Sequence, residues 1–286
     1  MSEPGRGLSR RGLLAAAVLA VAGGGVAGTG AVRHLRGDSA EAAGRAPTPD
    51  HLAAARSRVT AYVTTVGNLS VAVRDRTSGV ALTAGTGRFQ TASIVKVDIL
   101  AALLWQARQR GQEITDDDRS AAKKMITASD NVAATALYRR IGGKSGLTTA
   151  NKAFGMTETL PEAGWGITTT TAADQIRLLT SLTDEKGPLD EDSRSYLFDL
   201  MSQVEADQAW GVSAAGSANT RVYLKNGWDT FGVVGDRWQV NTIGRLVEPG
   251  HDWLVAVLSN HDKTQADGVK KVEAVAKYAV DELRKI

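Results

Sequence analysis

The segment Thr91–Trp105 constrains the fold of this chain more than any other stretch. Its apolar residues occur at positions 94, 95, 97, 99, 100, 103, 104 and 105, which lie around most of a helix rather than along one face. A helix that is apolar on nearly all sides is buried within a domain. The segment therefore predicts a central buried helix that begins at Ser93 and ends near Gly111.

Two polar residues lie at the start of this helix. Ser93 stands at the position of an N-cap, and Lys96 follows one turn later. Desolvation lowers the pKa of a buried lysine, and the N–H groups of a helix N-terminus favour negative charge on a serine oxygen. Ser93 and Lys96 are therefore a candidate nucleophile and base. Ser120 and Lys123 have the same spacing in a charged run, so spacing alone does not identify the pair.

Charge and composition exclude several classes of function. The formal net charge is +3, but residues 1–45 hold six Lys/Arg against three Asp/Glu, which leaves 28 of each in the remainder. The basic excess is thus confined to the N-terminal segment, and we expect no nucleic-acid partner. The chain has no cysteine, and its four histidines lack the H-x-x-x-H spacing of zinc hydrolases. We therefore expect neither a metal nor a cofactor.

The N-terminal segment has the features of an export signal. Arg10 and Arg11 precede an uncharged run at 12–32, and together they resemble a twin-arginine signal. Residues 1–32 are thus predicted to direct secretion, followed by a linker at 33–49 that is rich in Gly, Pro and mixed charge. The alternative is that the uncharged run anchors the protein to the outer face of the cell membrane, because its length just spans a bilayer.

The remainder of the chain runs from strands to helices and back to strands. The predicted strands are 69–75, 79–83, 221–224, 237–243 and 253–258. The predicted helices are 49–63, 93–111, 120–127, 132–141, 146–154, 171–182, 190–204 and 266–283. The simplest packing is an α/β (α+β) domain in which one five-stranded antiparallel sheet is flanked by the terminal helices and the helical middle forms a second lobe.

This pattern gives a predicted domain organisation. The domain covers 50–286, with a sheet lobe built from 50–90 and 218–286 and a helical lobe at 91–217. A cleft is expected between the two lobes. We expect the protein to be a monomer.

Three short motifs carry the candidate chemistry, and they are Ser93-x-x-Lys96, Ser129-Asp130-Asn131 and Lys225-Asn226-Gly227. This set resembles the motifs of class A β-lactamases and penicillin-binding proteins, and the resemblance extends over essentially all of residues 50–286. Motif order favours Ser93 over Ser120, since Ser120 lies only nine residues before Ser129 and leaves no room for a cleft. Lys225 is favoured over Lys144, whose Lys-Ser-Gly sequence follows a helix rather than ending a strand.

The resemblance implies a serine hydrolase that opens β-lactam rings through an acyl-enzyme on Ser93. Lys96 would be the base, and Ser129 would relay a proton to the leaving nitrogen with the help of Lys225. Asp130 would hold its loop in place. The expected partner is a small molecule, either a β-lactam or an acyl-D-alanyl-D-alanine peptide.

The same resemblance implies a set of substrate-binding residues. Asn131 would bind the side-chain amide of the substrate, and Asn226 stands where the family has a hydroxyl residue that contacts the substrate carboxylate. The backbone N–H groups of Ser93 and Trp228 would form the oxyanion hole. Gly227 would let the substrate lie close to the strand.

The chain departs from the family in the segment 155–168, which lacks the E-x-x-L-N pattern that supplies the deacylating glutamate. Glu158 and Glu162 are the acidic residues of this segment. Glu162 is the better candidate, because Pro161 fixes the backbone before it and glycines follow it. Its alternative is an ordinary solvated loop charge.

Two other functions remain open. One is a D-alanyl-D-alanine peptidase, or penicillin-binding protein, that acts on cell-wall peptides. The other is a module that binds β-lactams or peptides and is acylated slowly or not at all. These alternatives stay open because fold alone does not separate the activities.

Overall fold

The computed structural model describes residues 49–230 and 237–286. The predicted export signal at 1–32 and nearly all of the predicted linker lie outside the described residues. No helix among the described residues is long and apolar enough to cross a membrane.

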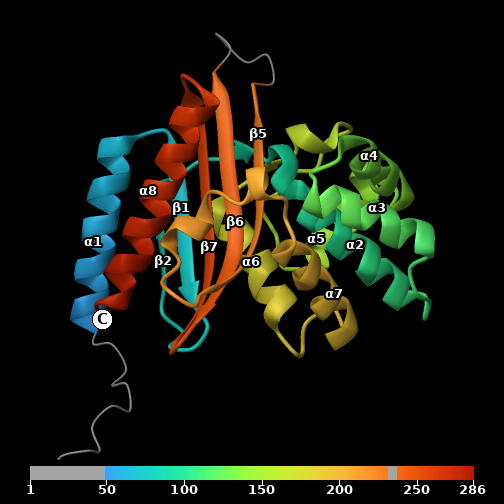
Figure 1. The fold of residues 1–286 in the computed structure, drawn as a ribbon, viewed down its shortest axis with the longest axis horizontal. Helices are drawn as coiled ribbons and strands as arrows, with labels where there is room; N and C mark the ends of the chain where they lie inside the picture. The colour runs from blue at the N-terminus through green and yellow to red at the C-terminus, as the bar shows by residue number, and fades with distance from the viewer. Residues whose placement is uncertain (1–48, 231–236) are drawn as a thin grey trace, which may run out of the picture. The chain divides into compact units, whose positions relative to one another are not determined.

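A five-stranded antiparallel sheet runs through the structure, with strand order β2-β1-β7-β6-β5 (Figure 1). Its strands are β1 (Leu69–Asp75), β2 (Ala81–Ala84), β5 (Arg221–Asp229), β6 (Trp238–Glu248) and β7 (His251–Asp262). The pairing of β1 with β7 joins the early and late parts of the chain in one sheet. The predicted fold class, an α+β chain with this sheet, is confirmed.

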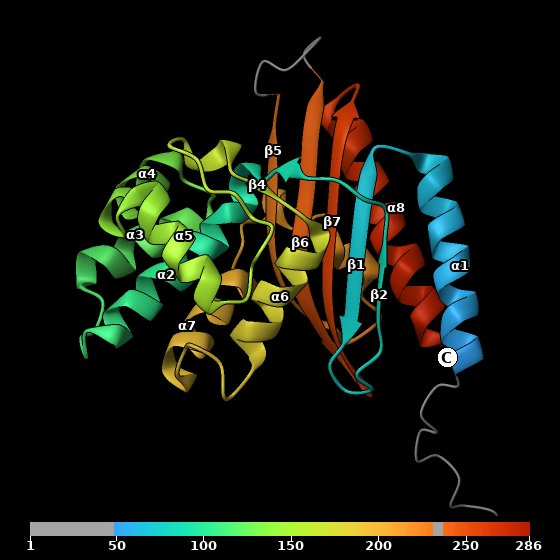
Figure 2. The same cartoon turned by 180° about the vertical axis from the view of Figure 1, so that it is seen from behind.

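Eight α-helices accompany the sheet among the described residues. They are α1 (Pro49–Val66), α2 (Val95–Gln109), α3 (Asp116–Thr127), α4 (Asn131–Arg140), α5 (Gly143–Ala153), α6 (Ala172–Thr183), α7 (Glu191–Ser202) and α8 (Gln265–Arg284). The terminal helices α1 and α8 lie together on one face of the sheet. The other helices gather on the opposite face and beside the edge strand β5, as the two opposite views show (Figures 1 and 2).

The core has two parts because the central strands bury both of their faces. Along β7, Leu254 and Ala256 belong to the cluster that contains α2 and α6, whereas Val255 and Val257 belong to the cluster that contains α1 and α8. This alternation follows the two-residue period of a strand. A strand that is covered on both faces reads as a continuous apolar run, which is why β7 was predictable from its composition.

Helix α2 occupies the predicted central position. Its residues from Val95 to Leu104 are all buried, and these include the polar Lys96. Its predicted start was wrong, however, because α2 begins at Val95 and is preceded by a 3-10 turn, η1 (Ala92–Ile94). Ala92 has a left-handed φ of 47°, so the chain enters through a tight turn and Ser93 is not an N-cap.

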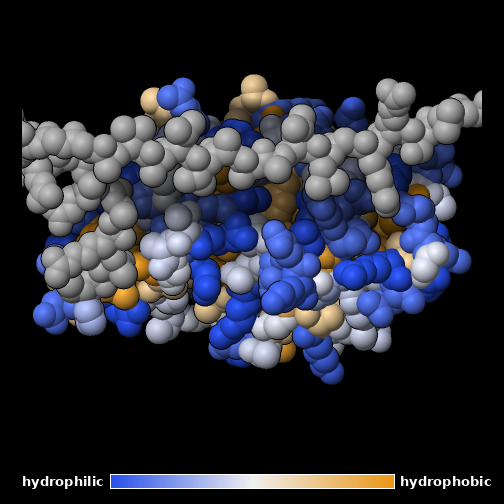
Figure 3. All heavy atoms as spheres, turned by 90° about the horizontal axis from the view of Figure 1, so that it is seen from below, coloured by the Kyte–Doolittle hydropathy of each residue, from blue (hydrophilic) through white to orange (hydrophobic). Residues whose placement is uncertain are grey.

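One face of the molecule shows how hydrophilic and hydrophobic side chains are distributed on the surface. Figure 3 shows one face of the molecule, on which hydrophilic side chains predominate among the described residues and hydrophobic ones are visible in small separate areas. Among the residues 49–230 and 237–286, the exposed large hydrophobic side chains are those of Val132, Leu160 and Ile167. Single exposed apolar side chains of this kind are common on globular proteins.

Candidate active site

The turn η1 presents Ser93 at the edge of the sheet. Ser93 is half-buried, whereas Ala92 and Ile94 on either side are fully packed. The edge strand β5 lies directly against this turn, because a Cβ built on Gly227 would be 2.6 Å from the backbone nitrogen of Ser93 and 2.7 Å from that of Ile94. The close contact between β5 and the turn η1 therefore requires a glycine at position 227. This steric requirement is separate from the predicted approach of substrate.

Lys96 is fully buried and is held by three polar contacts. Its Nζ donates to the carbonyl oxygen of Ser129 at 2.6 Å, to Ser129 Oγ at 3.0 Å and to Asn131 Oδ1 at 2.7 Å. Burial lowers the pKa of Lys96 to about 7, and the nearby negative charge of Asp130 partly opposes this effect. At neutral pH the amine is thus close to half protonated, which suits a residue that must accept and return a proton.

Lys225 approaches the same hydroxyl from the sheet. Its Nζ donates to Ser129 Oγ at 3.0 Å and to the carbonyl oxygen of Asn226 at 3.0 Å. Burial lowers the pKa of Lys225 well below its ordinary value, and the positive charge of Lys96 lowers it further. Ser129 Oγ therefore lies between two amines, so that a proton can pass along the three groups without crossing solvent.

The loop between α3 and α4 fixes Ser129 in this position. Ser129 has a positive φ of 56°, a conformation that an L-residue with a side chain rarely adopts and that is typical of functional sites. Asp130 is the N-cap of α4, and its Oδ1 accepts a hydrogen bond from the Ala133 backbone nitrogen at 2.6 Å. Asp130 is only half-buried, and its contact holds the loop rather than entering the proton path.

The two asparagines of the motifs lie in different surroundings. Asn131 is exposed, and its Oδ1 accepts from Lys96. Asn226 is fully buried, and its Nδ2 donates to the carbonyl oxygens of Gln208 and Trp210 at 2.8 and 2.9 Å. Because alternate residues of a strand face opposite ways, Lys225 and Gly227 face η1 and the Ser129 loop while the Asn226 amide is engaged by the 208–210 segment. The substrate contact expected of the Asn226 side chain remains a prediction.

Trp228 follows Gly227 on the edge strand β5. It is partly buried, and its ring lies 5.7 Å from that of Trp210 at an angle of 59°. The edge position of β5 leaves alternate backbone groups without a partner strand on one side. The predicted oxyanion hole, formed by the backbone N–H groups of Ser93 and Trp228, remains a prediction.

Glu162 is engaged by a residue outside this cluster. Its Oε2 lies 3.0 Å from Nζ of Lys144 on α5, and both side chains are about half exposed. Its carbonyl oxygen accepts from the hydroxyl of Tyr138 at 2.5 Å. The structure thus gives this carboxylate an ion pair with Lys144, and its predicted role in deacylation remains untested.

The competing motif matches lie on the surface. Ser120 and Lys123 are exposed on α3, and Lys144 is exposed on α5. None of these three side chains forms a hydrogen bond or ion pair with Ser129 or Lys225. The structure therefore gathers Lys96, Ser129 and Lys225 beside the Ser93 turn and leaves the alternatives apart from it.

One residue of the site was missed by the sequence reasoning. Trp165 begins the 3-10 turn η2 (Trp165–Ile167), and its ring centroid lies 4.9 Å from Lys96 Nζ. Its Nε1 donates to Thr135 Oγ1 at 3.2 Å. The sequence signal was a single tryptophan among glycines in a loop already assigned to the site. This signal is too weak to predict where the Trp165 side chain points. Within the described chain, no group of three or more His, Asp or Glu side chains is arranged to hold a metal ion.

Comparisons with known proteins give a family match and similar folds. The family model described as "Beta-lactamase enzyme family" matches residues 117–283, more than half of the chain. This match begins after Ser93 and Lys96, so it includes the second and third motifs and not the first.

A curated relative and several solved structures are similar to the chain. "Putative lipoprotein LppW" of Mycobacterium tuberculosis is 27% identical over 200 residues, which cover 67% of this chain and 62% of that protein. The chain thus spans less than two thirds of the curated relatives it matches.

The solved structures are similar in fold. A variant of PBP-A, solved as an acyl-enzyme complex with penicillin G, has a TM-score of 0.70 and 21% identity and covers 82% of this chain and 98% of its own. A β-lactamase from Xanthomonas campestris has a TM-score of 0.66 and 22% identity, with the same two shares of 82% and 98%. At these identities the likeness shows a common fold.

Proposed function

Since this chain belongs to the beta-lactamase enzyme family, we propose that it is a serine hydrolase that forms an acyl-enzyme on Ser93. The proposal depends most on one observation, which is that Ser129 Oγ lies 3.0 Å from Nζ of both Lys96 and Lys225. Two buried amines around one hydroxyl form a path for the proton that leaves the nucleophile and must reach the leaving nitrogen. The proposed substrates are β-lactams or related acyl-D-alanyl-D-alanine peptides.

The proposed acylation step uses these groups in order. Neutral Lys96 accepts the hydroxyl proton of Ser93 as Oγ bonds to the carbonyl carbon of the substrate amide. The C–N bond then breaks, and Ser129 passes a proton to the leaving nitrogen while it receives one from Lys96. Lys225 donates to Ser129 Oγ and thereby holds this hydroxyl in the proton path. One proton is transferred overall, and Lys96 ends neutral.

A second candidate function is a D-alanyl-D-alanine peptidase that acts on cell-wall peptides. It shares the first half-reaction and differs in how fast water releases the acyl group. The ion pair between Glu162 and Lys144 favours this candidate, because it occupies the one acidic side chain that was predicted to activate that water.

A location at the cell envelope fits both candidates. The similar mycobacterial protein carries the name of a lipoprotein, which is a cell-envelope class, and the paired arginines near the N-terminus favour export of the folded protein. We propose an extracytoplasmic location on these two grounds.

Labelling with a fluorescent penicillin tests the proposed function. Wild-type protein should become covalently labelled, and Ser93→Ala should abolish labelling while the surface control Ser120→Ala leaves it intact. Lys96→Ala should slow labelling by roughly 100-fold or more, the usual effect of losing a general base, whereas Lys123→Ala should not. Labelling that survives in Ser93→Ala would show that the nucleophile is wrongly assigned.

A further inference from the structure

Trp165 lies against an amine whose hydrogen-bonding capacity is already used. A lysine ammonium has three N–H donors, and Lys96 Nζ has three acceptors, two on Ser129 and one on Asn131. The indole ring of Trp165 covers the same nitrogen at 4.9 Å. The protonated amine therefore has no donor left for a water molecule, and the indole covers one side of the nitrogen in either protonation state.

The indole is held in place on two sides. Its Nε1 donates to Thr135 Oγ1, which in turn donates to the Asn131 carbonyl oxygen at 2.9 Å. The loop that carries it is fixed to the strand before the nucleophile, where the Thr91 backbone nitrogen donates to the Thr168 carbonyl oxygen at 2.8 Å. Trp165 is thus built into the wall of the site beside Lys96.

Release of an acyl group from Ser93 requires a water molecule, and Trp165 restricts the approach of water to Lys96. The oxygen of a water must bond to the acyl carbon as the ester bond to Ser93 Oγ breaks, with one water proton going to a base and one proton ending on Ser93. Lys96 is covered, and the carboxylate of Glu162 is paired with Lys144. A water that approaches Lys96 must therefore pass the indole, and one that approaches Glu162 must share its carboxylate with Lys144.

We propose that Trp165 is a positioning residue that shields the acyl group on Ser93 from hydrolysis, so that this protein forms a long-lived acyl-enzyme with β-lactams. The inference rests on the proposed function, because it requires acylation of Ser93. Acylation is then followed by slow hydrolysis of the acyl-enzyme. A persistent adduct corresponds to a penicillin-binding protein, and rapid release corresponds to a β-lactamase.

The test measures formation and release of the adduct separately. Wild type and variants are mixed with benzylpenicillin, excess reagent is removed, and the adduct is followed by intact-mass spectrometry. Trp165→Ala should speed release by roughly 10- to 100-fold, on the scale of admitting a general-base water, while the acylation rate changes by less than about threefold. A merely structural role would slow acylation and lower the melting temperature instead.

Two matched variants act as controls. Ile167→Ala removes an exposed apolar side chain from the same turn η2 and should leave the lifetime unchanged. Trp165→Phe keeps a ring over Lys96 and should also release slowly. If Trp165→Ala does not fold, Trp165→Leu keeps an apolar contact at this position and should give an intermediate lifetime.

The outcomes separate this inference from the proposed function. Adducts with equal lifetimes in wild type and the Ala and Leu variants would overturn the shielding role while leaving acylation of Ser93 intact. An equal shortening in Ile167→Ala would also overturn it, because a general disturbance of the loop would then be the cause. Absence of any adduct on the wild type would contradict the proposed function, and the shielding role with it.

Discussion

At the scale of single residues, the charge state of Lys96 decides when the site can act. The buried amine cannot take the proton of Ser93 while it is itself protonated, and its pKa is lowered to about 7 by burial, with Asp130 opposing. Burial lowers the pKa of Lys225 as well, so the two amines beside Ser129 need not both carry charge at neutral pH.

This leads to a prediction on pH dependence. The fraction of neutral Lys96 rises with pH through about 7, so the acylation rate should fall as pH drops below 7 and level off above it. Stopped-flow measurement of acylation by a chromogenic cephalosporin between pH 5 and 9 gives the midpoint. A rate that stays flat across this range would contradict the role of Lys96 as the base.

At the scale of elements, the contact between the edge strand β5 and the turn η1 sets the geometry around Ser93. A Cβ at Gly227 would overlap the backbone of that turn, with contacts at 2.6 and 2.7 Å. Such overlap forces one of the two elements to shift, since the opposing atoms are backbone.

Gly227→Ala should therefore lower the rate of acylation and destabilise the protein by about 1–3 kcal/mol, the usual cost of overpacking. Gly164→Ala is a suitable control, because Gly164 has a φ of −90° and its nearest neighbour to a new Cβ would be at 3.5 Å. Denaturant unfolding and penicillin labelling measure the two effects. Equal behaviour of the two variants would contradict the account of this contact.

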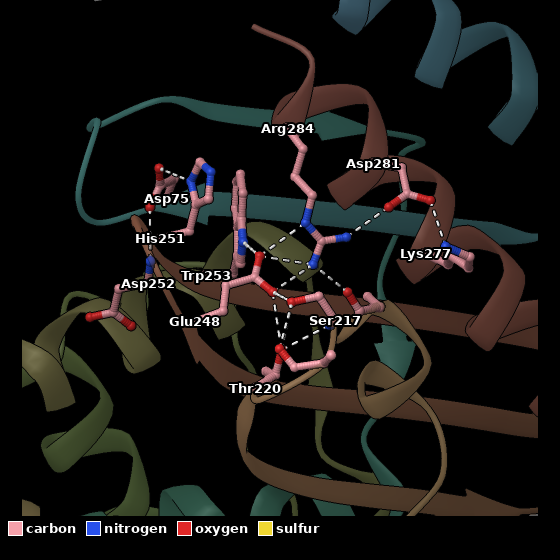
Figure 4. Close-up of polar contacts among 12 residues, drawn as sticks. Asp75, Ser217, Thr220, Glu248, His251, Asp252, Trp253, Lys277, Asp281 and Arg284 are labelled. Atoms are coloured by element: carbon pink, nitrogen blue, oxygen red, sulfur yellow. Dashed lines mark hydrogen bonds and ion pairs between the residues drawn. The ribbon is translucent and has the colours of Figure 1, made fainter. Parts of the chain in front are cut away.

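A network of hydrogen bonds around Glu248 joins helix α8 to the end of the sheet (Figure 4). Glu248 accepts from Arg284 Nε at 2.9 Å, from Trp253 Nε1 at 2.8 Å, and from the hydroxyls of Ser217 and Thr220. Burial alone would raise the pKa of this carboxyl, but these hydrogen bonds outweigh it and lower the pKa to about 2.

The folded-state pKa of Glu248 lies below its ordinary value of 4.5, so its contribution to stability is present above pH 4.5. That contribution should be lost as pH falls from 4.5 towards 2. Glu248→Gln should accordingly unfold more easily than wild type at pH 7, with the difference shrinking in acid. Urea unfolding at several pH values measures this, and a difference that is constant with pH would contradict it.

The length of each helix or strand and the period of its apolar residues decided whether the sequence could predict it. The sheet and the buried helix were predictable because β7 and α2 are long apolar segments with a clear pattern. The two-residue strands β3 (Phe89–Gln90) and β4 (Thr169–Thr170) and the turn η1 have no period to detect. Motif spacing predicted the residues around Ser129, but not the direction of Asn226 or Trp165, because side-chain direction in loops and edge strands is decided by tertiary packing.

At the scale of the whole molecule, the fold brings three distant parts of the described chain together at one site. Lys225 comes from a late strand, Lys96 from an early helix and Ser129 from the helical middle. These residues are far apart in sequence, so the site exists only in the folded domain. A route that exports folded protein is consistent with this requirement.

The export route is testable without reference to catalysis. Changing Arg10 and Arg11 to Lys should leave the precursor inside the cell, because the twin-arginine pair is the feature that this route recognises. Fractionation of the cells and detection with an antibody measure the distribution. Unchanged export would contradict the twin-arginine interpretation and leave the assignment of Ser93 untouched.

The most direct test of the central claim is to map where a penicillin attaches to the wild-type protein. Digestion with trypsin after brief acylation isolates the peptide Phe89–Lys96, which contains Ser93, and the peptide Ser120–Lys123, which contains the competing serine. We expect one adduct with the full mass of the penicillin, carried by Ser93 in the first peptide. Attachment to Ser120 or elsewhere, or a protein that gains no mass, would contradict it.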